Sequence, residues 1–139
     1  MAGRPPSRIK THDTPYIMKL HLTRAEGNLL ITGYDIGWVE INEIRHYKSL
    51  IVFPGHLIDD WFHGDFENLK EEDFKPLLPH KPEIVLLGTG LQHRFIHPKH
   101  THELIASGIG IECMTTPAAC RTYNILMAEG RHVAAALLI

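Results

Sequence analysis

The apolar residues in the first half of the chain fall in short runs separated by turn residues. Such runs stand at residues 17–22, 29–32, 36–41 and 50–53. Short apolar runs bounded by glycine, asparagine or proline are typical of β-strands. Gly27 and Asn28 supply a turn between the first two runs, so the pattern predicts a β-hairpin there. We therefore expect the first half to be rich in short strands.

The pattern is less regular in the stretch that follows. Over residues 54–70 apolar and acidic residues are mixed, and we expect irregular structure with a short edge strand. From residue 69 to residue 78 the apolar positions recur at helical spacing. This spacing predicts a helix that Pro79 and Pro82 close.

From residue 83 onward the pattern alternates between strands and helices. Residues 84–87 form a wholly apolar run, typical of a strand covered on both faces, and residues 109–113 predict a second strand. Between them Pro98 opens a predicted helix that Gly108 ends. The sequence therefore predicts an α/β fold, with α+β character in the first half.

The second predicted helix has the clearer end signals. Thr116 is the expected N-cap, Pro117 follows at the first helical position, and Gly130 stands where a C′ glycine belongs. The helix is expected over residues 118–129 and the last strand over residues 131–139. Short connections between alternating strands and helices predict right-handed crossovers within one sheet.

Length and charge exclude several classes of protein. The chain has 139 residues, which allows one compact domain, and we expect a flexible arm over residues 1–15 and a single domain over residues 16–139. The formal net charge of −2 argues against nucleic-acid binding, which needs a basic face. The longest clean apolar run, residues 133–139, is far shorter than the roughly 20 residues of a membrane helix.

Two observations predict the compartment. Cys113 and Cys120 are too few for a disulfide scaffold or a four-ligand zinc site, and we expect both to be buried thiols. The amino terminus carries Arg4, Arg8 and Lys10 with no apolar stretch behind them, unlike a secretory signal. We therefore expect a cytoplasmic protein.

Several contiguous motifs of the second half resemble one family. They stand at residues 82–90, 114–116, 118–126 and 129–131. The resemblance is to a family of domains of unknown function that includes an adipogenesis-associated protein and a mitochondrial complex I assembly factor. It implies a three-layer Mth-like fold, with a central mixed sheet, helices on one side, and helices plus a small antiparallel sheet on the other.

The same resemblance carries no established catalytic residue. This chain shows Thr115 where an acid often stands in the family, and from its first residues we expect no mitochondrial presequence. We therefore expect a bacterial member of the family. The resemblance to the assembly factor favours a non-enzymatic protein that acts by contact with a protein partner.

The candidate ligand site lies where two predicted loops meet. Open α/β sheets bind ligands at the carboxyl ends of their strands, and a helix start with free amides and nearby hydroxyls is suited to a carboxylate or a phosphate. The candidate residues are Gly88, Thr89, Gly90, Thr115, Thr116, Arg121 and Asn124. The alternative is structural: the glycines serve turn geometry, the threonines cap the helix, and Arg121 pairs with a buried acid or forms with Asn124 a polar network that pins the helix.

The histidines and acidic residues give no further site. His93, His97, His100 and His102 match no zinc motif, and the last two point in nearly opposite directions in a helix. We expect no metal, no cofactor and no catalytic residue.

Two functions therefore stay open. A protein-binding module predicts an exposed apolar patch, with Trp61 and Phe62 as candidates. A small anionic-ligand binder or enzyme predicts a pocket at the strand ends. The identity of the partner and the oligomeric state are not determined by the sequence.

Overall fold

The computed structural model describes residues 27–139, so the expected arm at 1–15 and the apolar run at 17–22 lie outside the described residues. The first part of the described chain forms a small antiparallel sheet. Its strands, in spatial order, are β1 (Ile31–Asp35), β2 (Trp38–Ile41) and β3 (Ile44–His46). The apolar run at 36–41 is therefore a turn followed by a strand, because Gly37 turns the chain with a φ of +88°.

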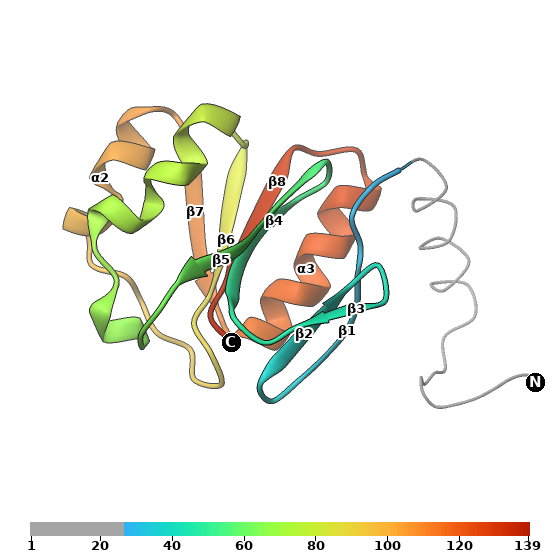
Figure 1. Cartoon of the computed structure of the whole chain (residues 1–139). Coiled ribbons are helices and arrows are strands. Elements are labelled where there is room, and N and C mark those ends of the chain that lie inside the picture. The colour runs from blue at the N-terminus through green and yellow to red at the C-terminus, as the bar shows by residue number, and fades with distance from the viewer. Residues whose placement is uncertain (1–26) are drawn as a thin grey trace, which may run out of the picture.

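A second, five-stranded sheet forms the centre of the molecule (Figure 1). Its strands in chain order are β4 (Ser49–Phe53), β5 (His56–Phe62), β6 (Ile84–Gly88), β7 (Gly110–Met114) and β8 (Val133–Leu137). The spatial order is β5-β4-β8-β6-β7, with β6 parallel to β7 and β8 and β4 antiparallel to β5 and β8. The central sheet is thus mixed. The edge strand expected within residues 54–70 is β5, and its seven residues make it longer than the short strand that the sequence predicts.

Both faces of the central sheet are covered. Helix α3 (Thr116–Ala128) and the small sheet cover one face. Helix α2 (Pro98–Ala106) covers the other together with the 3₁₀ helices η2 (Phe66–Asn68) and η3 (Glu71–His80) (Figure 1). Along β8, Val133 and Ala135 face α3 whereas Ala134 and Ala136 face the opposite layer. This alternation produces two separate cores and confirms the three-layer prediction.

The order of the strands creates a natural binding position. The chain passes from β6 through α2 to β7 at the sheet edge, then returns through α3 to β8 on the other side of β6. Because these crossovers run in opposite directions along the sheet, the same handedness places α2 and α3 on opposite faces, as Figure 1 shows. The carboxyl ends of β6 and β7 therefore lie at the point where the two connections separate.

Two element predictions need correction. The segment expected as an α-helix at 69–78 is the 3₁₀ helix η3, because Pro76 and Pro79 lie inside it and cannot donate the hydrogen bonds of an α-helix. The N-cap of α3 is Thr115, whose hydroxyl accepts from the N–H of Ala118 at 3.3 Å. Thr116 is instead the first helical residue.

The other end of α3 follows the prediction. Gly130 has a φ of +83° and its N–H donates to the carbonyl of Met127 at 3.0 Å. The N–H of Arg131 donates to the carbonyl of Leu126 at 3.2 Å, which completes a Schellman motif. The helix therefore ends where the glycine predicts, and the chain turns directly into β8.

Candidate functional site

The loops after β6 and β7 meet, as their topology predicts. The N–H of Thr116 donates to the carbonyl of Gly90 at 2.8 Å, and the N–H of Gly90 donates to the hydroxyl of Thr116 at 2.9 Å. The N–H of Thr89 donates to the carbonyl of Met114 at 2.8 Å. Backbone and side chain together thus join the two loops.

The threonine hydroxyls of this junction are buried and already have partners. The hydroxyl of Thr89 donates to the carbonyl of Gln92 at 2.6 Å and accepts from the N–H of Arg94 at 3.2 Å. The hydroxyl of Thr116 donates to the carbonyl of Leu138 at 2.7 Å. These groups hold the loops in place, and their hydrogen-bonding capacity is largely used within the protein.

Gly88 lets the helix approach the strand closely. A Cβ at this position would stand 2.9 Å from the hydroxyl oxygen of Thr116 and 3.0 Å from its Cα. It would also stand 3.0 Å from a methyl group of Leu137. The first turn of α3 can therefore lie against the end of β6 only when residue 88 lacks a side chain.

The side-chain amide of Asn124 makes hydrogen bonds to the backbone of β1, as the backbone of a neighbouring strand would. Asn124 is 5% exposed; its Oδ1 accepts from the N–H of Ile31 at 3.0 Å and its Nδ2 donates to the carbonyl of Ile31 at 2.7 Å. On the same face of α3, Nη1 of Arg121 donates to the phenol oxygen of Tyr34 at 2.9 Å. Both side chains thus contact β1, and Asn124 joins α3 to the small sheet.

A cavity of about 500 Å³ opens beside the loop junction. Of the seven predicted site residues, Gly90 and Thr116 line it, whereas the other five do not. Its walls come from the β1–β2 turn and the strand residues beside it, the loop after β6, the start of α3 and the chain after β8. The lining residues are Tyr34, Asp35, Ile36, Gly37, Trp38, Val39, Gly90, Leu91, Thr116, Pro117, Leu138 and Ile139. The cavity is predominantly apolar, and the contribution of the β1–β2 turn was not predicted.

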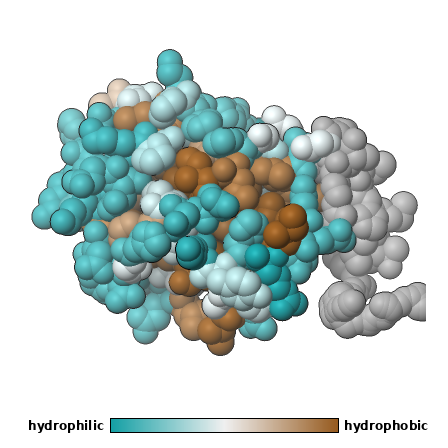
Figure 2. All heavy atoms as spheres, in the orientation of Figure 1, coloured by the Kyte–Doolittle hydropathy of each residue, from teal (hydrophilic) through white to brown (hydrophobic). Residues whose placement is uncertain are grey.

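Exposed apolar side chains stand at the rim of the cavity. Ile36 on the β1–β2 turn is 74% exposed, and Leu91 on the loop after β6 is 67% exposed. Figure 2 shows hydrophobic residues at the lower edge of the molecule, where the β1–β2 turn lies in Figure 1. We call the cavity together with Ile36 and Leu91 the apolar mouth.

Trp61 and Phe62, the aromatic pair proposed for an exposed patch, lie away from the cavity and pack against the rest of the protein. Phe62 is buried in the core beneath η3. The indole N–H of Trp61 donates to the carbonyl of Asp73 at 2.6 Å, and its ring packs against Phe74. The prediction that these residues form an exposed patch is therefore wrong, because the 3₁₀ helix η3 covers them.

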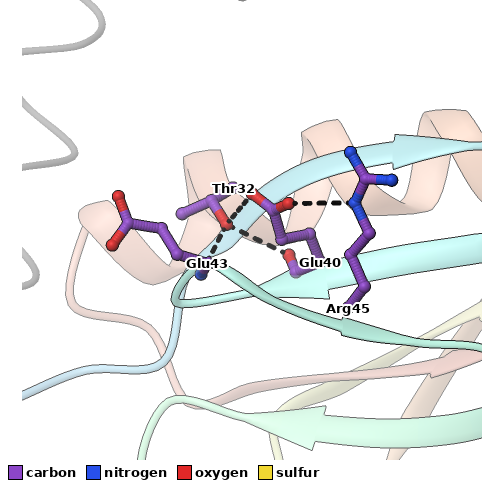
Figure 3. Close-up of polar contacts among 4 residues, drawn as sticks. All are labelled: Thr32, Glu40, Glu43 and Arg45. Atoms are coloured by element: carbon purple, nitrogen blue, oxygen red, sulfur yellow. Dashed lines mark hydrogen bonds and ion pairs between the residues drawn. The ribbon is translucent and has the colours of Figure 1, made fainter.

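A polar network on the small sheet holds one wall of the cavity. The guanidinium of Arg45 lies 3.9 Å from the ring centre of Trp38, and its Nε lies 3.4 Å from Oε1 of Glu40. The hydroxyl of Thr32 donates to Oε2 of Glu40 at 2.9 Å and accepts from the N–H of Glu43 at 2.9 Å (Figure 3). This network restrains Trp38, which lines the cavity.

Neither cysteine has the properties of a nucleophile. Burial raises the pKa of the Cys120 thiol to about 12 and also raises the pKa of the half-buried Cys113 thiol. Both are therefore protonated near neutral pH, and the thiol is a much weaker nucleophile than the thiolate. Within residues 27–139, no group of three or more histidine, cysteine, aspartate or glutamate side chains is arranged to hold a metal ion.

The environment of His80 predicts that the protein loses stability in mild acid. The ring of His80 packs against the rings of both Phe53 and His56, at centroid distances of 4.3 and 5.0 Å. Burial lowers the pKa of His80 from its usual value, and the charges of His56 and His132 lower it further. The unfolded chain therefore binds this proton more readily, and the stability present above about pH 6.5 is lost as the pH falls through the folded-state pKa.

Urea unfolding at about pH 7.5 and about pH 5 measures this effect. We expect the unfolding midpoint of the wild type to fall with pH, and that of His80→Phe, which keeps a stacking ring, to fall less. Equal pH dependence of the two proteins would contradict the assignment to His80.

Comparisons with known proteins show the family to which the chain belongs. A family model described as a protein of unknown function (DUF498/DUF598) matches residues 31–138. The chain belongs to this family. A mouse relative, NADH dehydrogenase [ubiquinone] 1 alpha subcomplex assembly factor 3, is 38% identical over 68% of this chain and 51% of its own length. The chain thus spans about half to two thirds of the length of the assembly factors it matches.

Solved bacterial relatives share the fold. A Bordetella parapertussis protein is 35% identical with a TM-score of 0.76 over 80% of this chain and 95% of that one. A Bordetella pertussis protein, described as an Mth938-like domain, is 28% identical with a TM-score of 0.71 over 94% and 92%. The expected Mth-like fold is thereby confirmed.

Relatives in the family carry different descriptions. A Bartonella henselae relative, 29% identical with a TM-score of 0.68 over 80% of this chain and 94% of that one, is described as an outer membrane protein. In the part of this chain that the structure describes, no helix has the length and apolarity to cross a membrane.

Proposed function

We propose that this family member binds a partner protein at the apolar mouth. The observation that carries the proposal is an apolar cavity of about 500 Å³ whose rim bears Ile36 and Leu91, both largely exposed. Contiguous exposed apolar surface is typical of protein-binding sites. A small ligand inside the cavity would leave the rim in water, whereas a partner chain covers both.

The names of the relatives support this kind of function. The mouse relative is named an assembly factor, a class of protein that works by contact with other proteins. We propose an assembly-type role for this chain as well, with the apolar mouth as its contact surface. No catalytic step is required, and the high pKa values of both thiols agree with a binding role.

The alternative is a small anionic ligand in the same cavity. One observation favours it, since the exposed Arg121 donates a hydrogen bond to Tyr34, which lines the cavity. The loop hydroxyls support it less, because they are bonded within the protein. NMR titration with a panel of anionic metabolites tests it: shifts at Thr89 and Thr116 favour the ligand, and silence across the panel contradicts it.

Quantitative affinity purification tests the leading proposal. We expect the double variant Ile36→Asp, Leu91→Asp to recover about tenfold less, or even less, of at least one protein partner than the wild type does. The reason is that buried apolar anchors dominate interface energies. Ile105→Asp is the matched control, since Ile105 is 58% exposed but lies on α2 at the opposite face. Melting temperatures confirm that all variants fold. An identical set of partners for every variant would contradict the proposal.

We also propose that the protein works in the cytoplasm. Both cysteines of the chain are free, and Cys120 is buried, which suits a reducing compartment. Cell fractionation tests this location: recovery with the soluble cytoplasmic fraction supports it, and recovery with the membranes contradicts it.

A further inference from the structure

We propose that the partner segment carries an acidic residue beside its apolar anchor, and that Arg121 binds this acid. The inference rests on the proposed function, because it specifies the partner of the same apolar mouth. Its starting point is the position of Arg121 on α3, one helical turn after Pro117, which lines the cavity. Arg121 does not itself line the cavity, but its guanidinium reaches the phenol oxygen of Tyr34, a residue that does.

Arg121 differs from the other arginines of the described chain. Arg45 pairs with Glu40, Arg94 with Glu67 and Arg131 with Glu83. Arg121 is the fourth arginine of residues 27–139, and no carboxylate of that part of the chain lies within 4.0 Å of it. Within the described protein, the charge of Arg121 thus has no carboxylate to balance it.

Tyr34 holds the guanidinium in position. The phenol oxygen accepts from Nη1 of Arg121 at 2.9 Å, and the Tyr34 side chain belongs to the cavity lining. One N–H of the guanidinium is used in this bond, and the remaining donors are available to a carboxylate, which arginine binds in a planar two-point geometry. Tyr34 is therefore a positioning residue for the pair.

A second charge gives the partner segment a direction. Asp35 lines the cavity from the β1–β2 turn, and its Oδ1 accepts from the N–H of Ile36 at 2.7 Å. Its negative charge disfavours an acid at that end of the cavity. The partner's acid is therefore expected on the α3 side of the apolar anchor, within a few residues of it.

Selection from a phage-displayed library of random 12-residue peptides tests this chemistry. Against the wild-type protein, we expect selected peptides to combine a bulky apolar residue with a nearby aspartate or glutamate. Against Arg121→Glu, we expect the acid to be replaced by lysine or arginine. Lys99→Glu makes the same change of charge on α2, away from the cavity, and should select the same peptides as the wild type.

A double-mutant cycle measures the contact directly. Changing the peptide's acid to its amide should weaken binding to the wild type about five- to tenfold, and should have little effect on binding to Arg121→Gln. Tyr34→Phe should reduce this coupling while leaving the apolar contact in place. Arg121 is exposed and makes one side-chain hydrogen bond, so Arg121→Gln should fold normally.

The outcomes separate the inference from the proposed function. Peptides that lose binding to Ile36→Asp but show no preference for an acid would overturn the inference and leave the proposed function standing. Selection of no peptide that depends on Ile36 would contradict both. Equal loss of the acidic preference in Arg121→Glu and Lys99→Glu would show general charge attraction and would also overturn the inference.

Discussion

Replacing Gly88 with alanine is expected to lower the free energy of unfolding by about 2–3 kcal/mol. The new methyl group would meet the backbone of Thr116 and the side chain of Leu137 at about 3.0 Å. A flexible side chain can move aside, but the Cα of Thr116 moves only if the start of α3 moves. The bonds between Thr116 and Gly90 would then be strained, and with them the wall of the cavity.

Urea unfolding followed by circular dichroism measures this loss. Gly110→Ala is the matched control, because it lies in the neighbouring strand β7 and its Cβ would stand 3.6 Å from the carbonyl oxygen of Glu83, an ordinary contact. We expect the control to change the free energy of unfolding by less than about 0.5 kcal/mol. Equal effects of the two alanines would show that the close approach at Gly88 is unimportant.

Replacing Asn124 with leucine is expected to cost about 3–4 kcal/mol of stability. Leucine has a similar size, but it leaves both the N–H and the carbonyl of Ile31 without the partners that the amide supplies. An unpaired buried polar group costs about 1–3 kcal/mol, and two are created at once. The small sheet should also become less firmly attached to α3, which hydrogen exchange at the β1 amides would detect.

Asn124→Asp gives the matched control for this prediction. A protonated aspartate can still accept from the N–H and donate to the carbonyl of Ile31, whereas an ionised one directs a second acceptor at that carbonyl. The folded-state pKa of the new carboxyl is therefore raised. Relative to the wild type at each pH, the variant should be most stable below about pH 4 and lose stability as the pH rises. A difference in stability between Asn124→Asp and the wild type that stays the same at every pH would contradict the claim that the Asn124 amide N–H donates to the carbonyl of Ile31.

The second half of the fold is predictable because its sequence signals are local and strong. Proline at the start and glycine at the end mark both α2 and α3, and the apolar run at 84–87 has the composition of a buried strand. The first half has weaker signals. The turn at Ile36 and Gly37 interrupts an apolar run, so the run indicates a single strand although the chain reverses there.

The candidate site is predictable only to the level of topology. The order of strands and helices brings the loops after β6 and β7 together, as expected. The partners of their polar groups depend on the folded backbone, and the partner of Asn124 is 93 residues away in the chain. No local pattern indicates that the β1–β2 turn closes the other side of the cavity.

The central claim, that the apolar mouth is the partner-binding surface, is tested most directly by site-specific photo-crosslinking in living cells. A photoreactive amino acid replaces Ile36 in one variant and Ile105 in another, both exposed but on opposite faces of the central sheet. The account predicts one defined crosslinked protein from position 36 and background labelling from position 105. Background labelling at position 36, or the same protein from both positions, would contradict it.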